Sequence, residues 1–68
     1  MKWYCVSLGI YTKNGHIMGV EDKEFEALDD ESAIEEAKAL ANELEEIYAC
    51  VMVDELIDQD GNEIQVHY

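Results

Sequence analysis

The chain has no arginine and no proline, and it contains only four glycines, two cysteines and one tryptophan among its 68 residues. With no Pro and so little Gly, no stretch is typical of a linker, a repeat or a low-complexity segment. No apolar run has the length of a membrane span or of the apolar core of a signal peptide. We therefore expect a single domain over residues 1–68, located in the cytoplasm.

Basic residues are the scarcest class, because four lysines stand against seventeen Asp and Glu and leave a net charge of −13. Charge of this size opposes compaction through self-repulsion, so a folded domain that keeps it is expected to use it against a basic protein partner. Direct binding of nucleic acid is disfavoured, since phosphate affinity needs a cationic surface. An anionic membrane surface is disfavoured for the same reason.

The hydrophobic content of 49% is too high for a disordered acidic tail. From Asp30 to Tyr48 the apolar residues recur at intervals of three and four, which predicts an amphipathic helix. Asp29 is a favourable N-cap for it, whereas the acidic residues near its far end lie where the helix dipole prefers cations. Three small residues on the apolar stripe would let the helix lie close on a sheet: Ala33, Ala37 and Ala41.

Residues 2–11 alternate in a pattern typical of a strand with apolar side chains on both faces. Asn14-Gly15 favours a two-residue type I′ turn, and so a hairpin with a second strand that ends at residues 24–28. The second half of the chain has a similar pattern, with a strand from Cys50 to Ile57, a polar turn over residues 58–62 and a last alternating segment up to Tyr68.

The register of the first hairpin contains a conflict. In an unbroken ladder Tyr4 faces Phe25, which is favourable, but Val6 then faces Lys23. A bulge or an irregular hairpin tip near Gly19 to Asp22 would remove this conflict. The sequence as a whole predicts an α+β fold of order β-β-α-β-β, with an antiparallel four-stranded sheet and one helix packed on one face.

No residue pattern indicates catalysis, and we expect no enzyme, no catalytic residues, no cofactor and no metal site. His16 and His67 lack the short spacing to Cys5 and Cys50 that a zinc site needs. The two cysteines lie in apolar stretches with acidic surroundings, which raise a thiol pKa, so they are expected to be buried structural thiols, with a disulfide or a reactive thiol as the alternative. The turn over residues 58–63 gathers oxygen ligands but lacks the spacing of an EF-hand loop.

The acidic residues form clusters on the second strand, the helix and the last predicted hairpin. Glu31 and Glu35 are like charges one helical turn apart, so the polar face is not mixed in sign as solubility alone would favour. We assign partner binding to residues in the latter two clusters: Glu31, Glu35, Glu36, Glu43, Glu45, Glu46, Asp54, Glu55, Asp58 and Asp60. Their rows of carboxylates resemble a duplex in charge density. The alternative is that the acidic face merely solvates the domain.

One helix covers only one face of a sheet, so we expect a second contact surface on the face that the helix leaves uncovered. Strand parity predicts an apolar interface there, formed by Trp3, Cys5, Tyr11 and Met52, with Cys50 and Leu56 beside them. An exposed patch that includes Trp and Met is typical of an interface. A homodimer through this face is the first hypothesis and docking of another partner is the second. Alternatively, sheet twist and strand ends cover the patch.

The chain resembles the small acidic proteins that phages and mobile elements use against bacterial defence, the anti-CRISPR class in particular. The resemblance rests on its brevity, its charge, the opening strand from Lys2, Glu24-Phe25-Glu26-Ala27 before the helix and Asp60-Gly61-Asn62-Glu63 before the last strand. It implies a stoichiometric inhibitor, in the cytoplasm of a bacterial host, whose carboxylates engage the basic nucleic-acid groove of a defence nuclease. A homo-oligomeric interaction or subunit protein is the alternative function.

Overall fold

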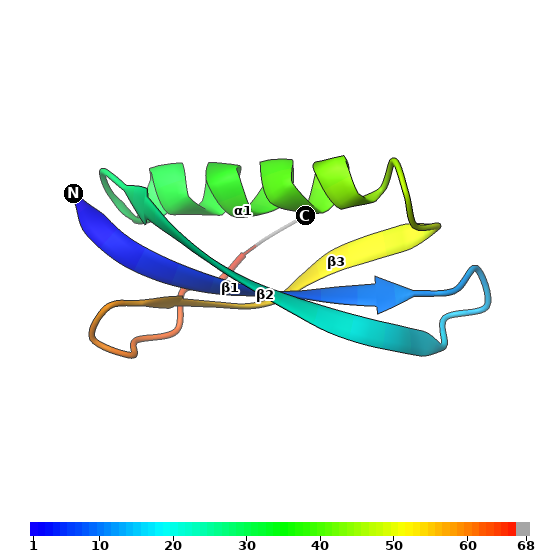
Figure 1. Cartoon of the computed structure of the whole chain (residues 1–68). Helices are drawn as coiled ribbons and strands as arrows, with labels where there is room; N and C mark the ends of the chain where they lie inside the picture. Colours follow the sequence, from blue (N-terminus) through cyan, green and yellow to red (C-terminus); the bar gives the residue numbers. More distant parts are fainter. Residues whose placement is uncertain (67–68) are drawn as a thin grey trace.

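The computed structural model describes residues 1–66, which form three strands and one helix in two layers (Figure 1). In chain order these are β1 (Lys2–Tyr11), β2 (Ile17–Ala27), α1 (Asp30–Leu44) and β3 (Cys50–Asp58). All pairing is antiparallel in the order β2-β1-β3, and α1 lies across one face of the sheet. Within residues 1–66 no helix has both the length and the apolar character needed to cross a membrane.

Helix α1 begins where the sequence predicts and ends earlier. The side chain of Asp29 accepts a 2.8 Å hydrogen bond from the backbone N–H of Ser32, as expected of an N-cap. The helix ends at Leu44 rather than Tyr48, and the backbone N–H of Tyr48 donates to the carbonyl of Leu44 at 2.9 Å. The last turn has no basic residue, so the negative end of the helix dipole meets further negative charge there.

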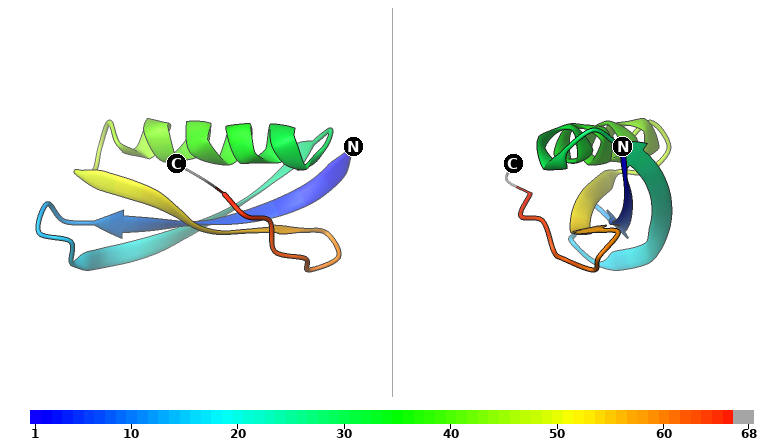
Figure 2. Two further views of the ribbon diagram at one scale, coloured as in Figure 1. Left: turned by 180° about the vertical axis from the view of Figure 1, so that it is seen from behind. Right: turned by 90° about the vertical axis from the view of Figure 1, so that its left-hand side faces the viewer.

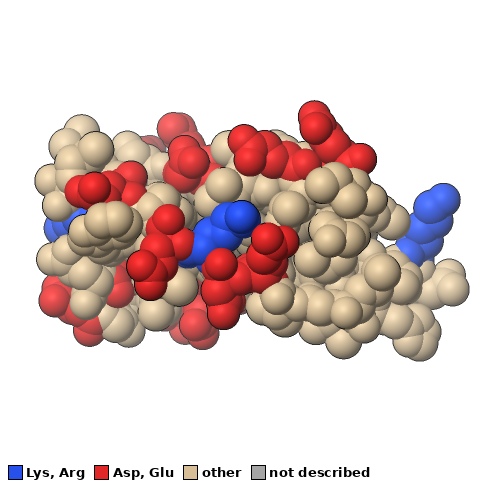
Figure 3. Space-filling model, in the orientation of Figure 1, with Lys and Arg blue, Asp and Glu red and all other residues tan. Residues whose placement is uncertain are grey.

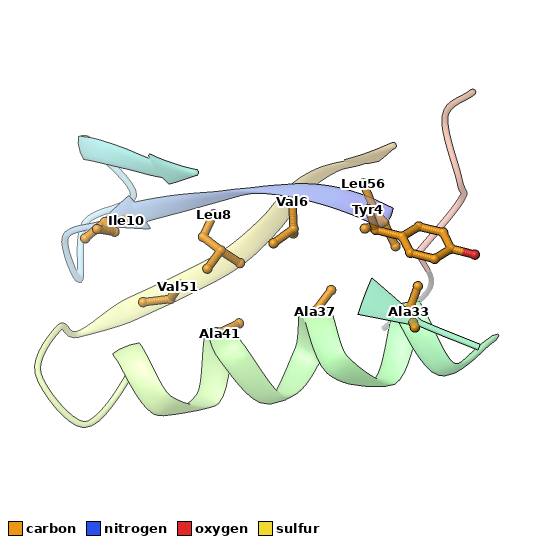
Figure 4. Close-up of a cluster of buried hydrophobic side chains, with 10 residues drawn as sticks. Tyr4, Val6, Leu8, Ile10, Ala33, Ala37, Ala41, Val51 and Leu56 are labelled. Atoms are coloured by element: carbon orange, nitrogen blue, oxygen red, sulfur yellow. The ribbon is translucent and has the colours of Figure 1, made fainter. Parts of the chain in front are cut away.

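The core lies between α1 and one face of the sheet (Figure 4). Its buried side chains come from all four elements: Tyr4, Val6, Leu8, Ile10, Ala27, Ala33, Ala37, Ala41, Val51 and Leu56. The predicted alanine stripe is confirmed, because Ala33, Ala37 and Ala41 face the sheet and are at most 2% exposed. Such small side chains let the helix backbone approach the larger residues of β1. The ring of Tyr4 also stacks on Phe25, with 5.9 Å between centroids.

The turn of the first hairpin differs from the predicted type I′ turn. No non-glycine residue among those described has a positive φ, whereas a type I′ turn would need one at Asn14. Instead Gly15 alone is left-handed, with φ +85°, and the N–H of Thr12 donates to the carbonyl of His16 at 2.8 Å. Three residues therefore separate the closing pair, which matches a type I turn followed by a left-handed glycine.

The hairpin is irregular at Met18, next to the predicted position near Gly19 to Asp22, but this irregularity does not remove the conflict in register. The ladder runs unbroken from Lys2 to Ile10, and the register shifts only between Ile10 and Tyr11, which leaves Met18 as the extra residue of β2. Val6 thus faces Lys23 after all. The conflict is relieved at the sheet edge, where the side chain of Lys23 remains 40% exposed and lies 3.5 Å from Glu21.

The fourth strand of the predicted β-β-α-β-β order is absent from the described residues, so the sheet has three strands there instead of four. After the turn, pairing with β3 is limited to the bridge Ile57–Glu63 and a 2.8 Å hydrogen bond from the N–H of Ile64 to the carbonyl of Leu56. Half-buried Ile64 and Val66 then pack against the core as the segment leaves the sheet toward the helix layer (Figure 2). The end of the predicted strand, Tyr68, lies outside the described residues.

A bulge in β3 explains why the final segment leaves the sheet and why Leu56 does not lie on the face predicted for it. Ser7 pairs with Glu55 and Leu8 with Val53, so Asp54 is an extra residue in β3. A continued hairpin would have to pair the final segment with this irregular position. The extra residue also reverses the alternation of β3, and Leu56, predicted on the outer face, is fully buried beneath α1 instead.

Candidate functional site

The sheet face away from α1, here called the outer sheet face, carries a group of carboxylates at its centre. The register places Glu24 opposite Cys5, and Ser7 between Asp22 and Glu55. The hydroxyl of Ser7 donates to Asp22 at 2.8 Å, which holds that carboxylate on this face. We call the following four residues the outer acidic band: Asp22, Glu24, Glu26 and Glu55.

Cys5 lies in the middle of the outer acidic band, and the pKa of its thiol reflects the negative charge of the band. Burial raises the pKa of the Cys5 thiol, and the negative charges of Asp22, Glu24 and Glu55 raise it further. The thiol therefore stays protonated near neutral pH, and it is a poor nucleophile and metal ligand. Both Cys5 and Cys50 are free thiols, but they are half buried where the sequence predicts buried thiols.

Asp54, which is the bulged residue of β3, is held against the outer sheet face by Tyr11. The Tyr11 hydroxyl donates to the two Asp54 carboxylate oxygens at 3.1 and 3.2 Å. This hydrogen bond is the main cause of the raised pKa of Tyr11, followed by burial. A Cβ on Gly9 would collide with the Asp54 carboxylate and the Tyr11 ring, so only glycine leaves room for this contact.

The predicted helical acidic residues form a separate surface on the other layer of the molecule. All are exposed, on α1 or in the turn that follows it: Glu31, Glu35, Glu36, Glu43, Glu45 and Glu46. In Figure 3 acidic side chains follow the helix along the upper side of the molecule. Because α1 covers one face of the sheet and the outer acidic band lies on the other, the structure does not bring the predicted acidic residues into one surface.

The last two predicted acidic residues are Asp58, at the end of β3, and Asp60, in the turn that follows. One oxygen of Asp58 accepts hydrogen bonds of 2.9 Å from the backbone N–H groups of Asp60 and Asn62. These bonds, with that to Asn62 first, lower the pKa of the Asp58 carboxyl. Gly61 completes the turn with φ +86°. Asp58 thus stabilises the turn, while Asp60 is exposed at its tip.

The predicted apolar interface is divided into two ends. Trp3 is 52% exposed at one end of β1, while Met52 is 45% exposed near the other end, where half-buried Tyr11 lies. The pair Asp22 and Glu55 lies between them on the outer sheet face. Trp3, Cys5, Tyr11 and Met52 therefore share a face but do not form a continuous apolar patch.

Exposed apolar side chains near the first turn were not predicted. Ile17, Met18 and Val20 are 60, 61 and 56% exposed, and Val20 and Met52 flank Gly9 on the outer sheet face. The signal was present in the sequence, since this segment is apolar at both parities and a single helix covers only one face. The part of Figure 3 that holds the β1–β2 turn shows no acidic side chain.

A hollow opens beside Trp3 at the other end of the sheet. Its volume is about 300 Å³, and its lining comes from β1, β2 and the end of β3: Trp3, Tyr4, Cys5, Glu24, Asp58 and Gln59. β1 extends beyond β3 at this point, so the backbone N–H of Trp3 donates to the side-chain carbonyl of Gln59 at 3.3 Å. Sequence reasoning did not single out Glu24 or Gln59 as site residues.

The histidines do not add a site among the described residues. His16 is exposed in the β1–β2 turn, and His67 lies outside the described residues. Within residues 1–66, no three His, Cys, Asp or Glu side chains are grouped so that they could hold a metal ion.

Comparisons of the chain with protein-family models, with curated proteins and with solved structures give no match.

Proposed function

We propose that the protein is a non-enzymatic inhibitor that occupies the basic surface of a nucleic-acid-binding protein, such as a phage-defence nuclease, as a nucleic-acid mimic. The observation that carries this proposal is the presentation of exposed carboxylates on ordered strands and a helix, on both layers of the molecule. A charge of −13 on such a scaffold is a shaped anionic surface rather than a flexible tail.

The charge density supports mimicry of a nucleic acid. The Cα positions extend over 36 Å along the longest axis, so a net charge of −13 corresponds to about 2.8 Å of length per charge. Duplex DNA carries one charge per about 1.7 Å of its axis. The two densities differ by less than a factor of two, so a cationic groove that binds a duplex would also attract this molecule.

Within the protein, the outer acidic band is the more suitable contact surface. Asp22, Glu24 and Glu26 alternate along one face of β2, which spaces their Cα atoms by about 6.8 Å, and a sheet holds this spacing rigidly. By contrast, the acidic residues Glu43, Glu45 and Glu46 lie at the C-terminal end of α1, where the helix ends earlier than the sequence predicts. Association should be fast and electrostatically steered, and it should weaken as salt screens the charges.

The test is competition for a nuclease. Purified phage-defence nucleases are loaded with fluorescent duplex DNA, and the protein is added while fluorescence anisotropy follows release of the duplex. Two variants, each with three charges removed, are compared with the wild type. The band variant carries Asp22→Asn, Glu24→Gln and Glu26→Gln. The helix variant carries Glu31→Gln, Glu35→Gln and Glu36→Gln.

We expect displacement of the duplex from at least one nuclease, with the band variant weaker than wild type by at least about tenfold and the helix variant less affected. Displacement should largely disappear at about 0.5 M salt. Failure to displace the duplex from any nuclease would refute the proposal. Displacement that does not change with salt and is the same for the wild type and both variants would also refute the proposal.

A second candidate function, a homo-oligomeric interaction protein, is favoured by the exposed apolar residues near the β1–β2 turn. Residues 9–20, which include the β1–β2 turn and the adjoining ends of both strands, contain one lysine and no acidic residue, so a second copy can approach this end without meeting most of the charge. Light scattering on wild type, Val20→Glu and Trp3→Ala tests the idea. A dimer that Val20→Glu dissociates supports it, and a wild-type monomer at high concentration excludes it.

A further inference from the structure

The hollow beside Trp3 has the size of a site for one side chain. Its volume of about 300 Å³ lies at the lower end of the range of about 300–1,000 Å³ typical of small-molecule pockets. Trp3 is 52% exposed, which is unusual for so large an apolar side chain in a domain with an available core. About half of Trp3 is therefore accessible to a group that enters the hollow.

The polar groups of the hollow favour a cation. Glu24 is exposed, and no described residue forms a hydrogen bond or an ion pair with its carboxylate. Asp58 differs, because its carboxylate is engaged by the N–H groups of the turn that follows β3. The electrostatic potential around Cys5, which lines the hollow, is negative as well, because after burial the charges of Asp22, Glu24 and Glu55 raise the pKa of its thiol. Glu24 is thus the free anionic group of this site.

An arginine side chain matches this combination better than a lysine does. The guanidinium group is planar, stacks on aromatic faces and donates two parallel hydrogen bonds to one carboxylate. Cations over a tryptophan face are attracted by the ring, and arginine is found there more often than lysine. Trp and Arg are also the residues that most often dominate binding energy at protein interfaces.

We propose that the Trp3 hollow binds the guanidinium group of an arginine presented by the basic partner, which stacks on the Trp3 indole and pairs with the Glu24 carboxylate. This inference rests on the proposed function, and it adds a specific anchor to a surface that otherwise attracts by net charge alone. Gln59, whose carbonyl already accepts from the N–H of Trp3, borders the site and holds the indole-bearing end of β1 in place.

Tryptophan fluorescence tests the site directly, because Trp3 is the single tryptophan of the chain. The wild-type protein is titrated with a blocked Gly-Arg-Gly peptide, with Gly-Lys-Gly and with an analogue that has neutral citrulline in place of arginine. We expect a saturable change in Trp3 emission with the arginine peptide. The lysine peptide should bind several-fold more weakly, and the citrulline peptide should give no saturable change.

Two variants with the same change in charge locate the site. Glu24→Gln should weaken binding of the arginine peptide by about fivefold, while Glu35→Gln on α1 should leave it unchanged. Both residues are exposed, and circular dichroism confirms that each variant is folded. Equal responses to the arginine and citrulline peptides would overturn the proposal. An effect of Glu35→Gln as large as that of Glu24→Gln would also overturn it.

These outcomes are separable from those of the proposed function. If the peptide experiment fails while the protein still displaces a duplex from a nuclease, the arginine anchor is refuted and the acidic inhibitor remains. If the arginine peptide binds with the expected selectivity while no nuclease releases its duplex, the hollow is a guanidinium site and the inhibitor proposal is refuted.

Discussion

The Tyr11 hydroxyl and the Asp54 carboxylate are joined by hydrogen bonds of 3.1 and 3.2 Å across the backbone of Gly9. The contact links the central strand to the bulged residue of its neighbour on the outer sheet face. It requires that the position between them has no side chain. Gly9 lies in the interior of β1, where glycine is otherwise unfavourable, so the requirement is specific to this contact.

Gly9→Ala should therefore destabilise the fold by about 1–3 kcal/mol, because the new methyl group displaces the Asp54 carboxylate and the Tyr11 ring. Urea unfolding followed by circular dichroism measures the change. Gly19→Ala is the matched control, since no atom lies within 4 Å of its added Cβ, and it should be neutral or slightly stabilising. Adding Asp54→Ala to Gly9→Ala should recover part of the loss; no recovery would contradict this explanation.

Tyr4 predicts a loss of stability at high pH. Burial, followed by the 2.8 Å hydrogen bond to Asp30, raises the pKa of Tyr4 from 10.0 to about 12. The unfolded chain therefore loses the phenol proton before the folded one does, so stability is complete below pH 10 and falls between about pH 10 and 12. The urea midpoint measured across this range should fall less steeply in Tyr4→Phe. Equal slopes in both proteins would count against the assignment.

The lowered pKa of Asp29 predicts that the stability of the fold also falls at low pH. Its hydrogen bonds from Ser32, backbone first, lower the pKa of the carboxyl below 3.8. The contribution of the charged N-cap is thus present above pH 3.8 and is lost as the pH falls further. Asp29→Ala should cost about 1 kcal/mol at neutral pH, whereas Asp29→Asn should keep most of the cap without the pH dependence. Thermal unfolding at neutral and acidic pH distinguishes the two variants.

The end of α1 offers a site for stabilisation. Glu45 caps a helix whose last turn has no basic residue, so Glu45→Lys should stabilise the fold by about 0.3–1 kcal/mol. Glu36→Lys makes the same change of charge in the middle of the helix, at a position with no charged residue three or four positions away, and serves as the control for net charge. An equal rise in urea midpoint for both variants would assign the gain to reduced self-repulsion instead of the helix dipole.

The features that could be predicted from the sequence are those decided by neighbouring residues. The N-cap at Asp29 and the alanine stripe of α1 depend on contacts or spacings within a few positions, and both are confirmed. The class of fold, α+β with one helix on an antiparallel sheet, followed from the same local patterns.

The errors arose where distant packing decides the conformation. No local signal marks the bulge at Asp54, yet it turns Leu56 inward and disturbs the position that a fourth strand would pair with. Ile64 and Val66 alternate like a strand, but they pack against the core from a segment that leaves the sheet. The hollow beside Trp3 was missed because it depends on where β3 ends relative to β1.

The strand order β2-β1-β3 leaves the long strand β2 at an open edge of the sheet, where a strand of a second copy could pair with it. From Glu21 to Glu26 the edge is protected, because like charges would oppose each other across such a contact. The uncharged stretch from Ile17 to Val20 lacks this protection, but the bulge at Met18 interrupts the regular ladder there. The irregularity in the first hairpin thus guards against edge-to-edge aggregation where the carboxylates are missing.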